Sequence, residues 1–321
     1  MNTPMNKLLA AALAAAGMAA AHATPTLNQR ITAATQTAHQ HADCTAIAPF
    51  YWEVGGAQTR LAGDSVLSTS DPTVVDANTL MNIASASKWM FASYVVQRQG
   101  TLTQAGIDLL TFTSGFTNFK ICLPGQTVGS CLDMGQNGVR SDDTIGHFFY
   151  NGGHMQKHAS LLGLGDMDNT ALAHEIRTQL GLDVQLSYSQ PQPAGGVVTT
   201  ASDYARFLRK ILTGTLAMKQ YLATPSVCTH QDPVKCPSAM HSPTDQAWHY
   251  GLGHWIEDDY ANGDDGAFSS AGAFGFYPWI DAGKTWYGVV ARRTDDAGEG
   301  FESQQCGKQI RRAWVTGVVQ H

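Results

Sequence analysis

The sequence predicts an α/β fold in which a mainly helical domain is inserted into a sheet domain. The first observation is the order of segments, because strand-like stretches lie near both ends of the chain and helical patterns lie between them. The second is the length, since 321 residues can form one large domain or two interleaved ones. We expect the sheet domain over residues 24–110 and 245–321, and the helical insert over residues 111–244.

The first 23 residues have the pattern of a secretory signal peptide. Lys7 precedes an apolar run that ends in the A-x-A sequence Ala21–Ala23. This run is too short and too rich in alanine for a convincing membrane span, and no cysteine follows it to carry a lipid. We therefore expect cleavage near Ala23, no stable membrane anchor, and a secreted or periplasmic bacterial protein.

The charge balance excludes some classes of partner. The formal net charge is −6, and no cluster of basic residues occurs, which argues against a nucleic-acid partner. His154 and His158 have the i, i+4 spacing of helical metal ligands, but no H-E-x-x-H pattern accompanies them. We expect no metal and no cofactor.

The cysteines indicate disulfide bonds. An even number in an exported chain favours pairing, and no C-x-x-C spacing points to a metal instead. Two pairs are close in sequence, and elimination joins the remaining two cysteines. The expected bonds are Cys122–Cys131, Cys228–Cys236 and Cys44–Cys306. Six cysteines allow fifteen pairings, so this set remains an expectation.

The first half of the chain contains a predicted hairpin and a predicted helix. Residues 48–65 read as two strands around a turn at Gly56, since they are rich in aromatic and β-branched side chains. A loop follows, and then a helix that begins near Ser85 and stops at Gly100. Residues 115–138 are predicted to form a loop that holds the first close cysteine pair.

The second half begins with the clearest helical pattern. Residues 200–214 carry an apolar stripe at helical spacing, with Ser202 as the expected cap and Gly214 as the stop. Residues 248–257, 272–281 and 285–293 then read as consecutive strands. A final helix is predicted over residues 303–319.

The predicted helix near Ser85 begins with a Ser-x-x-Lys motif, which is formed by Ser85 and Lys88. Positions i and i+3 share one helix face, so the hydroxyl and the amine can meet. Serine needs a neighbouring base to act as a nucleophile, and lysine serves only if its pKa is lowered. The motif alone favours a serine that caps a helix and an exposed lysine, and only its context points to a nucleophile.

Four further segments occur in a particular order: "LLTFTSGF" at 109–116, "FFYNGGHM" at 148–155, "PAGGVVTTASDYARFLRKIL" at 193–212 and "SAGAFGFYPWID" at 270–281. With Ser-x-x-Lys they resemble the serine β-lactamase and penicillin-binding-protein superfamily. The closest branch holds class C β-lactamases, D-Ala-D-Ala carboxypeptidases and related esterases. The resemblance implies a mostly antiparallel sheet flanked by helices, with an inserted helical domain and the site between them. It also implies that Ser85 is acylated and that Lys88 is its partner.

The second motif of this branch is Tyr-x-Asn, and its register here is ambiguous. Aligning Asn151 with the motif's Asn places Phe149 at the Tyr position and keeps a downstream glycine, Gly153. Aligning Tyr150 with the Tyr leaves Gly152 in place of the Asn. We prefer the first register, with Asn151 as a substrate-binding residue, and expect Tyr150 still to supply a hydroxyl.

The third motif, Lys-Thr-Gly or His-Thr-Gly, corresponds to Ser270-Ala271-Gly272. The resemblance implies that this strand lines the cleft, that Ser270 and Gly272 bind substrate, and that the N–H of Ala273 is an oxyanion donor. The Lys or His that helps recognise a substrate carboxylate is absent. Arg292 or Arg293, on the next strand, could partly replace it.

These residues together predict an exported serine hydrolase that forms an acyl-enzyme on Ser85. The bond cleaved would be an ester, an amide or a β-lactam. The partner is then a small-molecule or peptide substrate, with peptidoglycan-derived peptides among the candidates. The alternative is a catalytically weak or inactive binding protein on the same fold, in which Ser85 is a relic.

Overall fold

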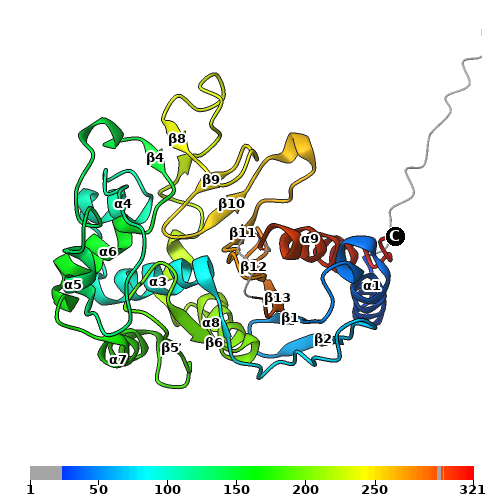
Figure 1. Ribbon diagram of the computed structural model, residues 1–321. Helices are drawn as coiled ribbons and strands as arrows, with labels where there is room; N and C mark the ends of the chain where they lie inside the picture. The colour runs from blue at the N-terminus through cyan, green and yellow to red at the C-terminus, as the bar shows by residue number, and fades with distance from the viewer. Residues whose placement is uncertain (1–23, 295–297, 299) are drawn as a thin grey trace, which may run out of the picture.

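A large antiparallel sheet forms the centre of the molecule (Figure 1). The computed structural model describes residues 24–294, 298 and 300–321, so the expected leader lies outside the described residues. Within them, eight strands form this sheet in the order β2-β1-β13-β12-β11-β10-β9-β7, and every neighbouring pair is antiparallel. Its strands are β1 Phe50–Gly56, β2 Arg60–Val66, β7 Val227–Cys228, β9 His249–Tyr250, β10 Trp255–Glu257, β11 Ala267–Ser269, β12 Phe276–Ile280 and β13 Trp286–Arg292.

Two small sheets flank the main one. An antiparallel sheet has the strand order β3-β6-β5, and β4 pairs in parallel with β8. These strands are β3 Met81–Asn82, β4 Phe148–Phe149, β5 Ser187–Tyr188, β6 Val197–Thr199 and β8 Ala239–His241. The β4–β8 pair joins residues that are about ninety positions apart, and it holds one wall of the site described below.

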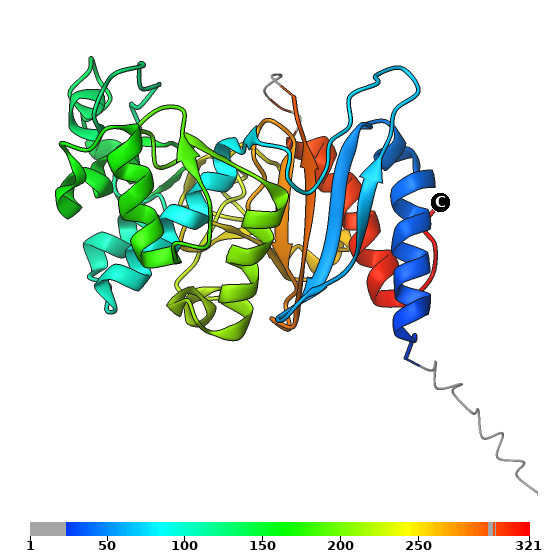
Figure 2. The same ribbon diagram turned by 90° about the horizontal axis from the view of Figure 1, so that it is seen from below.

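Helices at the two ends of the chain cover one face of the main sheet, as Figure 2 shows. Helix α1 Leu27–Gln40, which the sequence patterns did not lead us to expect, packs against α9 Gly300–Thr316. The short helix α2 Ala42–Thr45 is tied to α9 by the disulfide Cys44–Cys306. The apolar core on this face includes Trp52, Trp279 and Trp314.

On the other face, α8 Ala201–Thr213 packs against β1 and β13, and the remaining helices gather around α3 Ser87–Gln99 (Figure 1). Residues 87–96 of α3 are all buried, so the helix has no solvent-exposed face over its first ten residues. It ends as expected at Gly100, whose φ of 69° is the left-handed backbone that glycine adopts without strain. The other helices are α4 Gln104–Leu110, α5 Val128–Leu132, α6 Gly153–Ala159 and α7 Asn169–Leu180, with a π-helical segment Ser160–Leu164 and 3₁₀ turns Ala84–Ala86, Asp142–Thr144, Ala217–Tyr221 and Tyr260–Asn262.

Helix α8 forms where it was predicted, but its cap differs. Thr200, and not Ser202, is the cap, since its side chain accepts a hydrogen bond from the backbone N–H of Asp203 at 3.1 Å. Ser202 lies inside the first turn. The predicted stop at Gly214 is confirmed, because this residue adopts the left-handed conformation.

All six cysteines lie within the described residues, and they pair as expected in Cys44–Cys306, Cys122–Cys131 and Cys228–Cys236. The segment expected to be a loop around the second of these bonds also contains α5. Strand β7 belongs to the main sheet although it falls in the range assigned to the helical insert. In the described part of the chain, no helix is both long and apolar enough to cross a membrane.

Candidate active site

The site is built on the turn that leads into α3. One 3₁₀ turn, Ala84–Ala86, precedes the α-helix and keeps Ser85 and Lys88 on the same side. Asn82 fixes this entry, because its side-chain oxygen accepts the N–H of Ala84 at 2.9 Å. As a result, the Nζ atom of Lys88 lies 2.8 Å from the Oγ atom of Ser85.

Lys88 is buried rather than exposed. Its side chain passes through the core, and Nζ also donates to the carbonyl oxygen of Ala194 at 2.8 Å. Loss of water around the ammonium form lowers the pKa of Lys88 from 10.5 to about 7. A lysine with this pKa is substantially neutral at physiological pH and can accept the proton of the Ser85 hydroxyl. The exposed lysine of the simple helix-cap interpretation is therefore wrong.

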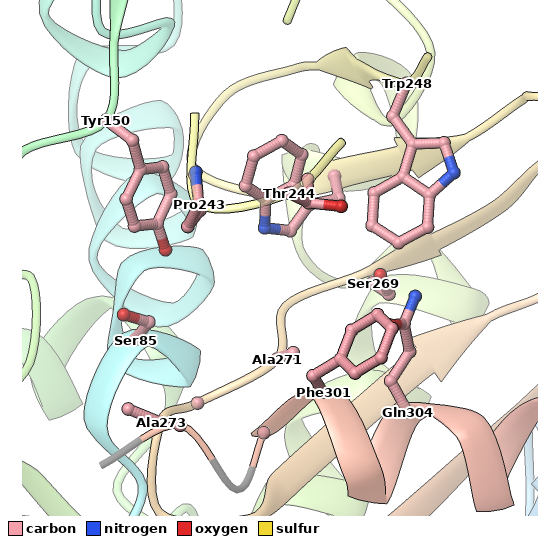
Figure 3. Close-up of a pocket in the computed structure, with 14 residues that line it drawn as sticks. Ser85, Tyr150, Pro243, Thr244, Trp248, Ser269, Ala271, Ala273, Phe301 and Gln304 are labelled. Atoms are coloured by element: carbon pink, nitrogen blue, oxygen red, sulfur yellow. The ribbon is translucent and has the colours of Figure 1, made fainter. Parts of the chain in front are cut away.

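Tyr150 also adjoins Ser85, and its hydroxyl points toward the Ser85 side chain (Figure 3). Its ring is stacked on Trp255 with 5.4 Å between centroids, and Nζ of Lys88 lies 4.9 Å from the centre of the Tyr150 ring. Burial raises the pKa of Tyr150 to about 12, although a side-chain hydrogen bond with Ser85 acts in the opposite direction. The phenol therefore keeps its proton at neutral pH and can donate it.

The preferred register for the second motif is wrong in this structure. The side chain of Asn151 holds backbone: its amide donates to the carbonyl of Phe119 at 3.1 Å and its oxygen accepts the N–H of Gly153 at 2.8 Å. Asn151 does not line either of the cavities that reach Ser85. Tyr150, by contrast, lines the cavity at Ser85, as the alternative register expects.

The reason for this register is tertiary. The N–H of Phe148 donates to Ser238 and the N–H of Tyr150 donates to His241, at 2.7 and 2.9 Å. These bonds to the β8 segment determine which side chain of "FFYN" turns toward Ser85. No signal within the four residues themselves contains this information.

The third motif lies directly against the turn that carries Ser85. A Cβ atom at Gly272 would stand 2.1 Å from the carbonyl oxygen of Ile83, so only glycine allows this approach. Ser270 is buried, and its hydroxyl donates to the carbonyl oxygen of Ser85 at 3.2 Å. Ser270 thus holds the turn, whereas Gly272 and Ala273 line the cavity.

Two backbone N–H groups near the nucleophile are free to bind a ligand. Among the described residues, the N–H groups of Ser85 and Ala273 donate no hydrogen bond within the protein. Both residues line the same cavity. A pair of free donors beside a serine hydroxyl is the arrangement that binds an oxyanion.

Two cavities of different character meet at Ser85. The first, of about 230 Å³, is mainly apolar, and Figure 3 shows its wall of aromatic side chains. Its lining residues are Ser85, Tyr150, Pro243, Thr244, Trp248, Trp255, Ser269, Ala271, Gly272, Ala273, Gly298, Gly300, Phe301 and Gln304. The second, of about 340 Å³, is lined by Asn82, Ala84, Ser85, Lys88, Lys120, Ile121, Ser189, Gln190, Gln192, Ala194, Gly195 and Phe274.

Sequence reasoning missed most of the aromatic wall. Trp248 and Trp255 are in strand-like sequence, where aromatic side chains are expected in the core, and Phe301 comes from the first turn of α9. The cationic replacement that we considered, Arg292 or Arg293, lines neither cavity. Arg292 forms an ion pair with Glu302, with 3.1 Å between Nη1 and Oε2.

Of the two histidines with metal-like spacing, His154 holds neighbouring segments together. His154 lies 2.7 Å from the Ser114 hydroxyl through Nδ1 and 3.0 Å from the Phe149 carbonyl oxygen through Nε2. Burial lowers the pKa of His154 to about 4, so it is neutral. It connects α6 to β4, the strand that directly precedes Tyr150. Within the described part of the chain, no group of three His, Cys, Asp or Glu side chains could hold a metal ion.

Comparisons with known proteins bear on the fold. No family model and no curated protein match the sequence. Among solved structures, a penicillin-binding protein from Bacillus halodurans is 15% identical, with 80% of this chain and 94% of that chain covered and a TM-score of 0.56. EstCE1, described as a hydrolase with promiscuous acyltransferase activity, is 14% identical, with coverages of 90% and 98% and a TM-score of 0.56.

The chain has the fold of the serine β-lactamases and penicillin-binding proteins. SurE, solved with D-Leu, is similar as well, with 14% identity, coverages of 92% and 77% and a TM-score of 0.61. Structural similarity at this level of identity establishes the fold alone. The expected architecture is therefore confirmed, while the chemistry must be argued from the residues of the site.

Proposed function

We propose that this protein is a serine hydrolase that forms an acyl-enzyme on Ser85 and cleaves an ester, an amide or a β-lactam. The observation that carries the proposal is the 2.8 Å contact between the Ser85 hydroxyl and an amine that burial makes substantially neutral at pH 7. A purely structural role would not explain a lysine at this buried position, because burial of an ammonium group is unfavourable.

The first half of the reaction follows from the positions of these groups. Lys88 takes the proton of the Ser85 hydroxyl while Oγ attacks the substrate carbonyl, and the carbonyl electron pair moves to its oxygen. The N–H groups of Ser85 and Ala273 stabilise this oxyanion. When the carbonyl reforms, the bond to the leaving group breaks, and the leaving group takes a proton from Tyr150 or from the Lys88 ammonium.

Water completes the cycle. Water attacks the acyl carbonyl and gives a proton to the group that protonated the leaving group, which is now either the neutral Lys88 amine or the Tyr150 phenolate. The bond to Ser85 Oγ then breaks, the acyl group leaves as an acid, and Lys88 or Tyr150 returns a proton to Oγ. Both proton carriers adjoin the Ser85 hydroxyl, so one can accept a proton while the other donates. No cofactor takes part in this scheme.

Covalent labelling tests the proposal before any substrate is known. Purified protein is treated with a fluorophosphonate and with a labelled penicillin, and the adduct is located by peptide mass spectrometry. Nitrocefin, a D-Ala-D-Ala peptide and p-nitrophenyl esters are then assayed for turnover. We expect an adduct on Ser85 and turnover of at least one substrate class, both lost in Ser85→Ala.

Ser93→Ala is a matched control, since Ser93 lies on α3, the helix that follows Ser85, and its buried hydroxyl has no hydrogen-bond partner in the described structure. This variant should keep both adduct and turnover. Absence of an adduct with every reagent, or equal labelling in Ser85→Ala, contradicts the proposal. The protein would then be the binding protein of the alternative hypothesis.

Export is the second part of the proposal. The three disulfides support an oxidising compartment, and the leader pattern over residues 1–23 supports secretion or transfer to a bacterial periplasm. The substrate would then be a small molecule or peptide met outside the cytoplasm, and peptidoglycan-derived peptides belong to the assay panel for that reason.

A further inference from the structure

The aromatic cavity beside Ser85 carries information about the substrate. Trp248 and Trp255 are each only 4% exposed, yet both face this space, and Phe301 closes it from the start of α9 (Figure 3). The cavity extends from the nucleophile itself, since Ser85 and Tyr150 line one end of it. A group bonded to the reacting carbonyl can therefore enter it.

No charged side chain lines this cavity among the described residues. Its polar groups are hydroxyls and one amide, from Thr244, Ser269 and Gln304, besides those of Ser85 and Tyr150. The position where related motifs have Lys or His is occupied by Ser270, whose hydroxyl is bonded to the Ser85 carbonyl oxygen. A carboxylate placed in this cavity would lose water and find no cation.

The charges behind the floor of the cavity are already paired. The carboxylate of Glu257 accepts from the Ser269 hydroxyl at 2.6 Å and from the Arg311 guanidinium at 2.7 Å. Glu257 and Arg311 are both almost fully buried, and the pair is further held by the Tyr277 hydroxyl at 2.7 Å. Arg311 also pairs with Asp265 at 2.7 Å, so its guanidinium is held by two carboxylates and offers no unpaired cation to the cavity.

The second cavity at Ser85 differs in each of these respects. Lys120 lines it, and amide side chains such as Gln190 and Gln192 form much of its wall. The surroundings of the nucleophile are therefore asymmetric, with an apolar side and a polar, cationic side. A substrate that uses both cavities has one neutral apolar group, and any negative charge lies on its other group.

We propose, on the basis of the function proposed above, that the substrate places an uncharged aryl or alkyl group in the cavity formed by Trp248, Trp255 and Phe301. The protein then discriminates against a carboxylate on that group. It accepts a carboxylate only on the group that lies toward Lys120.

Two matched pairs of substrates test this inference, one pair for each group that could enter the cavity. On the acyl side, p-nitrophenyl hexanoate is compared with p-nitrophenyl hydrogen adipate, in which a carboxylate replaces the terminal methyl. On the leaving-group side, 4-acetoxybenzamide is compared with 4-acetoxybenzoate. Each kcat/KM is divided by the uncatalysed rate of hydrolysis, and the adduct at Ser85 is measured in parallel.

We expect one of the two pairs to show a preference of about tenfold or more for its neutral member, because the carboxylate is desolvated without a partner. Phe301→Arg should reduce that preference by about threefold to fivefold, since a half-exposed cation at the cavity mouth provides a modest ion pair. Val315→Arg is the matched control, because it adds the same charge to the exposed surface of α9 about 21 Å along the helix. It should leave the preference unchanged.

The outcomes separate this inference from the proposed function. If Ser85 is labelled and substrates turn over, but neither pair shows a preference for its neutral member, the inference is overturned while the hydrolase proposal stands. An equal effect of Phe301→Arg and Val315→Arg also overturns it. If no adduct forms and nothing turns over, the proposed function fails, and this inference fails with it.

Discussion

Replacement of Lys88 by methionine tests whether the buried lysine is neutral in the folded protein. The pKa of Lys88 is 10.5 in the unfolded chain and about 7 in the folded protein. Between these two values the unfolded state binds more protons than the folded state. Stability therefore rises with pH from about 7 to about 10.5, and the full penalty for burying the lysine applies below pH 7.

The magnitude follows from the same two pKa values. Their difference corresponds to about 5 kcal/mol, because one pKa unit is worth about 1.4 kcal/mol. With partial titration included, the penalty is about 4 kcal/mol at pH 7 and about 2 kcal/mol at pH 9. The wild type should therefore gain about 2 kcal/mol of unfolding free energy over this interval from Lys88 alone, relative to Lys88→Met, whose side chain does not titrate.

The assay is equilibrium unfolding in guanidinium chloride at pH 7 and at pH 9, followed by tryptophan fluorescence with the disulfides intact. Methionine is chosen because it has a similar length and is apolar. Ser85→Ala is the control, since it removes the nucleophile but keeps the lysine, and it should show the pH dependence of the wild type. If the difference in stability between wild type and Lys88→Met is the same at both pH values, Lys88 is not neutral in the folded state, and the argument for it as a base is refuted.

Two further predictions concern the other groups around the nucleophile. Tyr150→Phe should lower kcat by about 100-fold with a smaller change in KM, because it removes a proton donor and keeps the ring; an unchanged kcat in steady-state assays would exclude the phenol from proton transfer. Gly272→Ala should lower both kcat/KM and the melting temperature, since its Cβ would collide with the carbonyl oxygen of Ile83. Gly165→Ala is its control, because an added Cβ there meets nothing within 4 Å, and equal melting temperatures and activities in the two variants would contradict the prediction.

Much of the fold could be predicted because the relevant interactions are local. The hairpin of β1 and β2, the stop of α3 at Gly100 and the body of α8 follow from turn residues and from periodicity within about fifteen residues. The cap of α8 was misassigned to Ser202 because Thr200 offers the same chemistry two positions earlier. Helix α1 went unpredicted, since its polar sequence forms a helix mainly against α9 at the far end of the chain.

In the candidate site, too, contacts within one helical turn could be predicted, whereas contacts between distant segments could not. Ser85 and Lys88 are three positions apart, so a helical turn is enough to bring them together, and the sequence predicts the contact. The choice between Tyr150 and Asn151 depends on hydrogen bonds to the segment of β8, about ninety residues away, and the sequence-based choice was wrong for that reason.

The sequence by itself therefore determined that the serine and the lysine share one helical turn and that the cation of the third motif is missing, and it favoured the disulfide pairs that the structure shows. Tertiary structure alone decided the pKa of Lys88, since the shift arises from burial by elements as distant as Ala194. It also decided which aromatic side chains face the nucleophile. Spacing along a chain specifies neighbours within a turn or a strand, whereas solvation and cavity shape depend on every element that packs around a group.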